Sequence, residues 1–453
     1  MSFSSIIFIF IFLPLSIILY YLIPVKYRHK YLVIISLLFY LASGIRSLII
    51  LLVLILFNFY ATRKMDKLTH KDRKWYFWII VGVDVFLIFY YKYYFPFLNL
   101  ITSSSNFRTL LAPLGLSFYL FTILSYVIDV YKRKIKCEQN LLNFALYVSF
   151  FPKLLMGPIV RYNAFRKELR KKKFNENLFN LGFKRFILGL GMKTILADTF
   201  ANIIASYSSS STIGSIVLLI LYSLQIYYDF AGYINMALGI SNIFGFRFEE
   251  NFTYPYSSSS VSEIWNRWHI TLGKWFKDYI YIPLGGNRKG TKKLIINILI
   301  VWLLTGIWHG ATLNFIIWGL YFGIILIIEK LWFKKKKVPN YLRVIITLIL
   351  VSIGWLIFFN KDFSVIFNNL KHLVIWNKFI DQDIWFIIKN NFVYLVLGII
   401  MATPLIRNIG KKIKDKNIKV YNILNVIYLV LLFILSISFL ISNSYKTFLY
   451  FNF

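Results

Sequence analysis

The sequence predicts an all-α integral membrane protein that forms one polytopic domain over residues 1–453. Of the 453 residues 58% are hydrophobic and only 15% are charged, and the mean hydropathy is +0.65. This composition excludes an ordinary water-soluble globular domain. The 52 basic and 18 acidic residues leave a net charge of +34, which favours loops held against anionic lipid at the cytoplasmic face. Nucleic-acid binding would need a basic soluble face, and the sequence offers none.

A membrane-spanning helix needs roughly 20 mainly apolar residues, and the chain supplies roughly ten to thirteen candidate segments. The opening run follows no basic residue and has no small-residue cleavage site, so we expect a first membrane helix, not a cleaved signal. Pro152, Lys153, Gly157 and Pro158 interrupt the sixth run, which favours a broken or re-entrant helix buried in protein. The runs are 3–23, 31–43, 46–61, 75–91, 109–130, 141–160, 179–196, 213–231, 294–308, 311–332, 342–359, 384–406 and 420–441.

Lysine and arginine gather in alternate loops, and the positive-inside rule assigns such loops to the cytoplasm. This places the N-terminus outside the cell, and the last run then delivers the tail 442–453 to the extracytoplasmic face. The basic segments are 26–30, 63–74, 132–136, 166–173, 334–337 and 407–419.

The sequence lacks the residues that several common kinds of active site require. The one cysteine, Cys137, excludes an intramolecular disulfide and a thiolate metal cluster. There is no Walker phosphate loop, no HExxH zinc pattern and no GxSxG nucleophile elbow. We therefore expect no metal site, and redox and nucleotide-hydrolysing functions lose support.

Two of the five histidines stand apart from the rest. His309 lies inside the apolar stretch 302–312, where an ionisable side chain is costly and is a functional candidate by default. The alternative is a neutral histidine bonded to a backbone carbonyl within the helix bundle. His29, His70 and His372 lie in or beside polar loops, and we expect them to be solvated or interfacial.

His269 lies in the segment 262–279, which mixes tryptophan with Asn266, Arg267 and several lysines. Such a mixture is typical of the membrane interface, so an interfacial anchor helix is the alternative to a functional histidine. Only one basic turn and one short span separate His269 from His309. An interfacial or re-entrant helix would bring the two histidines together.

A third candidate segment is 225–239. Asp229 at membrane depth needs a cationic partner such as an arginine or histidine, and Arg267 is a candidate. Gly232 permits a close approach of another backbone. The alternative role for Asp229 is a purely structural ion pair.

Several motifs together resemble the membrane-bound O-acyltransferase (MBOAT) family, in particular its bacterial branch of alginate and peptidoglycan O-acetylation proteins. The most specific is the block 265–290, which runs WNRWHITL and then WFKDYIYIPLGGNRKG. A lone Trp-His-Gly would be weak, but TGIWHGA at 305–311 accompanies that block, and the resemblance covers most of the chain. Further matches lie at the opening 3–24 and at 128–131, 150–158 and 228–233.

This resemblance implies a ring of tilted and re-entrant helices around a central funnel and tunnel. It implies that His309 is the essential catalytic residue, with His269 near it, and we place Asn266, Arg267, Asp229 and Trp308 along the tunnel as substrate-binding residues. The implied activity passes an acyl group, preferably acetyl, from a cytosolic thioester across the membrane for O-acylation of a polysaccharide. The donor would be acetyl-CoA or an acyl carrier protein, with no bound cofactor. The implied partner is a separate extracytoplasmic SGNH-type acyltransferase.

The C-terminal segment Lys446–Phe453 resembles an aromatic motif of the same branch with a central tyrosine, here Tyr450. The resemblance implies that the Tyr450 hydroxyl carries the acyl group, and the alternative is an aromatic anchor at the membrane interface.

Three other functions stay open at the level of sequence. The teichoic acid D-alanylation branch of the family shares both histidines, although we expect it to match the stretch Ile282–Arg288 less well. A transporter or flippase for a lipid-linked sugar would use the buried histidine and aspartate as a proton relay, but we detect no inverted repeat. A non-enzymatic scaffold for a polysaccharide synthase is the third alternative.

Overall fold

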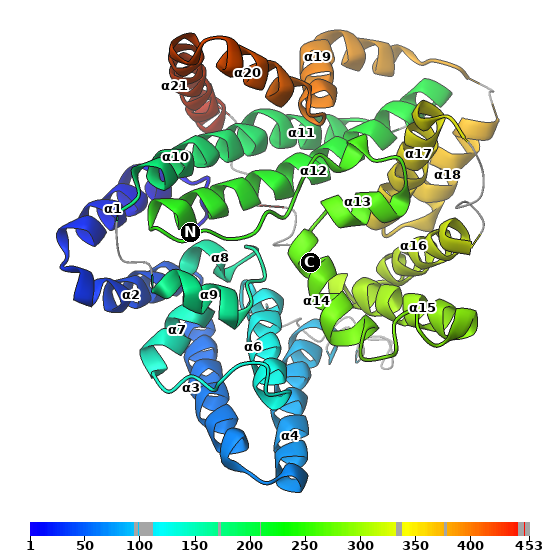
Figure 1. The fold of residues 1–453 in the computed structure, drawn as a ribbon. Coiled ribbons are helices and arrows are strands. Elements are labelled where there is room, and N and C mark those ends of the chain that lie inside the picture. Colours follow the sequence, from blue (N-terminus) through cyan, green and yellow to red (C-terminus); the bar gives the residue numbers. More distant parts are fainter. Residues whose placement is uncertain are drawn as a thin grey trace. The chain divides into compact units, whose positions relative to one another are not determined.

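The computed structural model describes residues 1–94, 98, 112–170, 174–208, 210–331, 338–375, 378–442 and 448. Over these residues the chain is helical and contains no β-strand (Figure 1). Nine helices in this part of the chain are long and apolar enough to cross a membrane, and two shorter apolar helices cover Phe8–Leu22 and Leu116–Tyr131. The predicted all-α membrane class is therefore confirmed.

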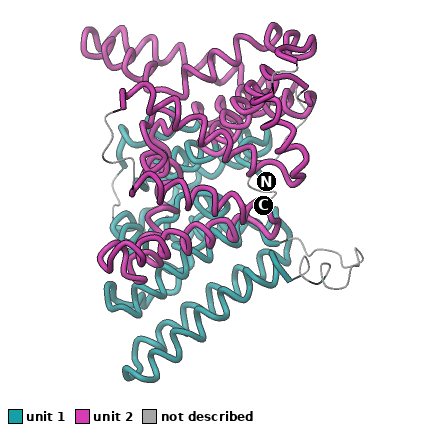
Figure 2. Tube along the Cα trace, turned by 90° about the vertical axis from the view of Figure 1, so that its right-hand side faces the viewer, with its two compact units in different colours: residues 1–186, 233–249, 450–452 teal, residues 187–232, 250–449, 453 magenta. Residues whose placement is uncertain are grey.

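The chain separates into two compact units, each discontinuous in sequence (Figure 2). The first unit holds the described residues of Met1–Phe186 and Tyr233–Glu249, and the second holds those of Ile187–Gly232 and Glu250–Leu449. The boundary crosses two long helices, α10 (Glu176–Gly191) and α12 (Thr212–Ile243), so the helix ends belong to different units.

The first unit is built around aromatic side chains. The Phe3 ring stacks on Tyr233, 5.0 Å between centroids, and Phe39 lies 5.3 Å from Phe151. These rings are almost completely buried, so they supply much of the apolar area that this unit removes from lipid and water. Its helices, besides parts of α10 and α12, are α1 (Leu13–Leu22), α2 (Arg28–Leu41), α3 (Ile45–Lys67), α4 (His70–Phe89), α6 (Leu116–Tyr131), α7 (Leu141–Ser149), α8 (Phe151–Leu154) and α9 (Tyr162–Leu169).

The predicted break in 141–160 is confirmed. Helix α7 ends at Ser149, and α8 is a single turn. The Phe151 N–H, which has no partner inside its own helix, donates to Ser36 Oγ at 3.1 Å. A Cβ on Gly157 would lie 2.3 Å from the Lys153 Cα, so the returning chain requires glycine there. Protein groups thus satisfy the interrupted backbone, as a lipid environment demands.

The second unit contains the C-terminal half of the chain. Helices α15 and α16 pack closely on each other as a hairpin, and α17 packs on α16. Besides parts of α10 and α12, the helices are α11 (Asp198–Ser206), α13 (Val261–Arg267), α14 (Ile270–Phe276), α15 (Gly290–His309), α16 (Leu313–Leu331), α17 (Asn340–Phe359), α18 (Phe363–Val374), α19 (Gln382–Met401), α20 (Leu405–Lys416) and α21 (Ile418–Ser442).

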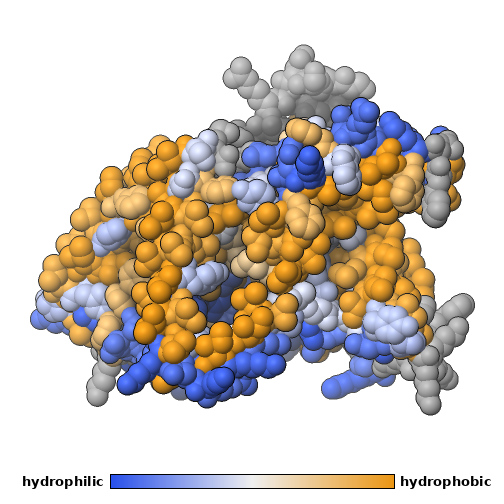
Figure 3. Space-filling view, turned by 90° about the horizontal axis from the view of Figure 1, so that it is seen from above, coloured by the Kyte–Doolittle hydropathy of each residue, from blue (hydrophilic) through white to orange (hydrophobic). Residues whose placement is uncertain are grey.

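Much of the exposed surface is apolar, as a lipid environment requires. Apolar side chains cover much of the face in Figure 3, with hydrophilic side chains gathered toward its margins. On α21, Leu431 and Ile434 are 55% and 58% exposed, and they belong to a long series of exposed aliphatic residues. A water-soluble protein rarely exposes so large an apolar area.

Candidate active site

His309 is the last residue of α15, and Gly310 follows in an extended conformation that ends the helix. The histidine is only 5% exposed. Its ring lies 4.6 Å from Trp308, 5.0 Å from Trp318 and 5.1 Å from Phe358, centroid to centroid. Helices α15, α16 and α17 therefore each place an aromatic side chain against this imidazole.

Two glycines allow α15 and α16 to approach closely just before His309. A Cβ on Gly306 would lie 2.4 Å from the Phe315 carbonyl oxygen, and a Cβ on Gly319 would lie 2.4 Å from the Trp302 oxygen. Gly319 and Gly323 form the small-xxx-small pattern that lets membrane helices pack backbone to backbone. The crossing holds Trp318 against the histidine ring.

We expect Gly319→Ala to lower the stability of the protein by about 1–3 kcal/mol, because the new methyl group collides with backbone that cannot move locally. Thermal unfolding of the purified protein in detergent measures the effect. Gly82→Ala is the matched control, since this glycine of α4 has open space around its position. Equal unfolding temperatures for the two variants would contradict the close crossing.

His269 occupies the joint between α13 and α14. Its backbone is left-handed, with φ 43° and ψ 51°, a conformation that costs a residue other than glycine about 1–3 kcal/mol. The buried Asn251 supports this joint: its carbonyl accepts from Ile270 N–H at 3.1 Å, and its Oδ1 accepts from Thr271 N–H at 2.9 Å. Strained residues held by their surroundings concentrate at functional sites.

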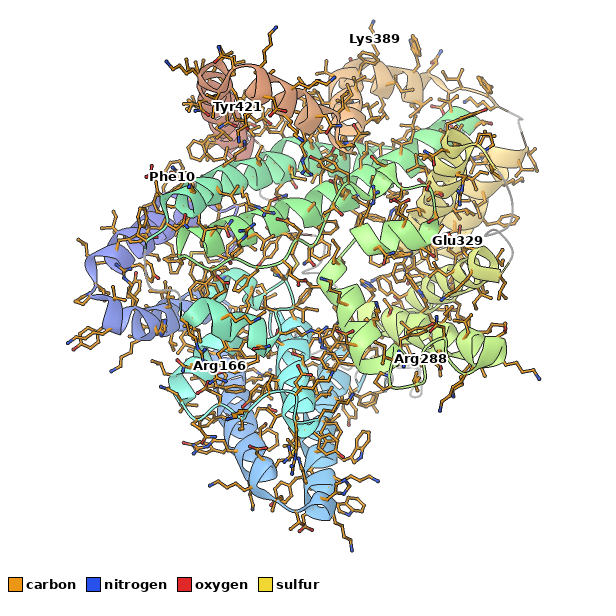
Figure 4. The ribbon with its side chains drawn as sticks, viewed as in Figure 1. Phe10, Arg166, Arg288, Glu329, Lys389 and Tyr421 are labelled. Carbon is orange, nitrogen blue, oxygen red and sulfur yellow. The ribbon has the colours of Figure 1, made fainter. Side chains whose placement is uncertain are left out.

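The helix before His269 is capped at its start by side chains. Ser260 Oγ accepts from Glu263 N–H at 3.1 Å, and Glu263 accepts in return from Ser259 N–H at 2.8 Å. Glu329, which projects from α16 and is labelled in Figure 4, accepts from Val261 N–H at 2.7 Å. The hairpin that carries His309 therefore also fixes the helix that leads to His269.

The two histidines meet at one tryptophan. The His269 ring lies 6.4 Å from Trp308 and 4.8 Å from Phe230, and Trp308 also contacts His309. His269 lies outside the candidate membrane spans, and burial lowers its pKa to about 3. Its imidazole is therefore neutral at physiological pH and can donate or accept a hydrogen bond without carrying charge.

Asp229 is buried and paired with a lysine. Lys193 Nζ lies 2.7 Å from Asp229 Oδ1 and 2.8 Å from Asp198 Oδ1. The suggested pair between Asp229 and Arg267 is wrong, because Arg267 bonds Glu263 one turn earlier on α13, at 2.5 Å. The closer partner on the same helix satisfies this guanidinium.

The lysine of this cluster lies in a π-helical segment, Met192–Ala197. Such segments are rare and often occur at functional positions. Lys193 Nζ also lies 4.6 Å from the centroid of the Phe448 ring, which is fully buried. On α12, Gly232 permits the predicted close approach, since a Cβ there would lie 2.9 Å from the Gly189 oxygen.

The remaining predicted site residues differ in their exposure. Asn266 is exposed on α13, and Trp308 is buried between the histidines. Tyr450 lies outside the described residues. Sequence reasoning missed Lys193, Asn251, Gly306 and Gly319, although a lysine within the apolar run 179–196 and the Gly319-xxx-Gly323 spacing were both visible signals.

Comparison with known proteins identifies three relatives of this chain. The chain is 37% identical over 380 residues to a probable alginate O-acetylase AlgI of Pseudomonas aeruginosa, covering 81% of this chain and 73% of the relative. It is 32% identical over 422 residues to a peptidoglycan O-acetyltransferase of Helicobacter pylori, covering 82% and 79%. It is 29% identical over 280 residues to a teichoic acid D-alanyltransferase of Bacillus subtilis, covering 56% and 71%.

The model of the membrane-bound O-acyltransferase family matches residues 132–361. This range includes Asp229, both buried histidines and the α15–α16 hairpin, in which His309 is the last residue of α15. The family model and the two relatives above 30% identity agree on an O-acyl transfer enzyme embedded in the membrane. The chain therefore belongs to the membrane-bound O-acyltransferase family.

Proposed function

We propose that the protein passes an acetyl group from a cytosolic thioester across the cell membrane for O-acetylation of a polysaccharide at the outer face. The observation that carries this proposal is the contact of both buried histidine rings with Trp308 in one unit. Two buried imidazoles can supply the proton acceptor and the hydrogen-bond donor that acyl transfer to oxygen needs.

In the proposed step His309 removes the proton of the acceptor hydroxyl as its oxygen attacks the thioester carbonyl carbon. The resulting tetrahedral oxyanion accepts a hydrogen bond from the neutral His269 ring. The carbon–sulfur bond then breaks, and His309 returns the proton to the departing thiolate. The products are an oxygen ester and a free thiol, and both histidines end in their starting state.

The proposed direction of transfer follows from the positive-inside rule, which puts both termini outside and the basic loops inside. Thioesters are made in the cytosol, whereas surface polysaccharides lie outside. A funnel and tunnel that reach His309 from both sides would let the acyl group cross while the donor stays in the cytosol. Asn266 and Arg267 are proposed for the polar wall of this passage, together with Asp229 and Trp308.

The activities of the relatives support acetyl as the group transferred. The two O-acetylating relatives match 81% and 82% of this chain, whereas the D-alanyltransferase matches 56% at lower identity. We propose acetyl-CoA as the donor, and an acyl carrier protein is the alternative donor. We further propose a separate SGNH-type acyltransferase outside the cell as the partner that completes O-acetylation.

The proposal is tested in the native organism by deleting the gene and analysing purified surface polysaccharide by NMR. We expect the O-acetyl signal to disappear and to return when the wild-type gene is restored. Loss of ester-linked alanine would assign the D-alanyl function instead. Unchanged acyl content with less polysaccharide at the surface would support the transporter or scaffold reading and contradict ours.

We also propose that Tyr450 carries the acyl group between donor and polysaccharide. The resemblance of the segment Lys446–Phe453 to the aromatic motif, together with the assignment of the tail to the outer face by the positive-inside rule, supports this role. A phenyl ester lies between a thioester and an alkyl ester in transfer potential, so it can accept from one and donate to the other.

Tyr450→Phe keeps an aromatic anchor and removes only the hydroxyl. We expect it to abolish polysaccharide acetylation at normal protein levels, as measured by NMR of the polymer. Tyr341→Phe, at a tyrosine that is 65% exposed, is the matched control and should leave acetylation unchanged. Full acetylation in the Tyr450 variant would exclude the carrier role.

A further inference from the structure

The first unit contains a cavity of about 290 Å³ whose lining includes neither His269 nor His309. This volume is near the lower end of the range for small-molecule sites, roughly 300–1,000 Å³. Its walls come from the start of α2, the loop between α6 and α7, α7 itself and α9. The lining residues are His29, Glu138, Asn143, Arg166, Leu169 and Arg170.

The cavity is cationic. Arg166, labelled on α9 in Figure 4, and Arg170 make no ion pair with any residue that the structure describes. The one carboxylate, that of Glu138, is already engaged. It accepts hydrogen bonds from the Tyr162 hydroxyl and from the N–H groups of Gln139 and Asn140, the latter two at 2.9 and 2.8 Å.

The spacing of the two arginines is unfavourable without an anion. Arg166 lies in the last turn of α9 and Arg170 directly follows the helix, so the two are four residues apart, a spacing at which like charges repel on a helix. An anion between the two guanidinium groups removes this repulsion. Phosphate suits them well, because the planar guanidinium fork matches two phosphate oxygens at once.

The cavity also joins regions that the charge pattern assigns to a single side of the membrane. His29 belongs to the first basic segment, Glu138 follows the third, and the two arginines belong to the fourth. The positive-inside rule places all three segments in the cytoplasm. Their meeting at one cavity within one unit fits that assignment.

We propose that this cavity binds a phosphate group at the cytoplasmic face, through Arg166 and Arg170. The phosphate comes from an anionic lipid headgroup or from a phosphate-bearing acyl donor such as a coenzyme A thioester. The donor source rests on the proposed function, whereas the phosphate chemistry does not.

The test measures binding to purified protein in phosphatidylcholine nanodiscs, with two probes: coenzyme A, and phosphatidylglycerol added to the bilayer. All proteins carry His309→Ala, so binding is measured without turnover. The test variant is Arg166→Gln with Arg170→Gln. The matched control is Arg407→Gln with Lys411→Gln, which removes two charges at the same spacing from exposed positions of α20.

We expect the test variant to bind at least one probe about tenfold or more weakly, and the control to bind both within about twofold of the parent. Weaker binding of coenzyme A alone assigns the donor, weaker binding of phosphatidylglycerol alone assigns a lipid, and weakening of both assigns a phosphate site open to either. If the double variant does not accumulate, the single variants replace it. Unchanged binding of both probes would overturn the proposal, whatever the gene deletion shows about acetylation.

Discussion

Replacing His309 by alanine is expected to slow acyl transfer by about 10²–10⁴-fold, the usual contribution of a positioned general base. A hydroxyl is a poor nucleophile until its proton is removed, and His309 is the buried imidazole at which α15, α16 and α17 converge. The rate is measured with purified protein, acetyl-CoA, a soluble oligosaccharide acceptor and the proposed SGNH-type partner.

The control for this experiment is His372→Ala, which removes the same side chain from α18 in the same unit and is expected to leave the rate unchanged. Both variants should insert and accumulate like the wild-type protein. Acyl transfer at the wild-type rate in the His309 variant would exclude the proposed base, and equal loss in both variants would indicate a general fault of folding.

Replacing Lys193 by methionine is expected to destabilise the protein by about 3–5 kcal/mol, the cost of breaking a buried ion pair by removing one partner. The lysine is 2% exposed and lies within 2.8 Å of carboxylates of both Asp198 and Asp229. Without it, the buried Asp229 and the largely buried Asp198 are left as neighbouring carboxylates with little access to solvent. Thermal unfolding in detergent measures the effect.

The informative control is the triple variant Lys193→Met, Asp198→Asn, Asp229→Asn, which removes the whole charge cluster. We expect it to recover much of the stability that the single variant loses, because neutral amides are less costly to bury than unpaired carboxylates. Lys411→Met, at an exposed lysine of α20, should have little effect. A triple variant no more stable than the single one would contradict the cluster as an electrostatic unit.

The sequence predicted the features that depend on local composition. The run 141–160 contains its own helix breakers, Pro152 and Gly157, and the structure breaks the helix there. Gly232 was expected to permit close packing and does so against Gly189. The final residue of α15 was identifiable because a histidine in an apolar stretch is unusual on energetic grounds.

Features set by tertiary contacts escaped prediction. The partner of Asp229 is 36 residues earlier in the chain, and no local pattern links the two. The left-handed backbone of His269 is followed by two N–H groups that donate to Asn251, 18 residues earlier in the chain, and no glycine at this position indicates such a turn. The run 213–231 extends to Ile243 as α12 because packing within protein allows a helix much longer than the membrane requires.

Helices α18 and α20 were missed for a different reason. Helix α20 carries many lysines, which lower its hydropathy below that of a membrane span. Helix α18, at 12 residues, is too short to cross a membrane. Each concentrates its apolar residues on one face, and that periodicity was the available signal.

The most direct test of the account uses sealed proteoliposomes in which the basic loops face one side and the termini the other. Radiolabelled acetyl-CoA is supplied only on the side of the basic loops, and the polysaccharide acceptor together with the proposed SGNH-type partner only on the opposite side. The account predicts labelled polysaccharide with the wild-type protein and none with His309→Ala, while coenzyme A stays where it was added. Label that reaches the polymer equally well without His309, or only when donor and acceptor share a side, would contradict it.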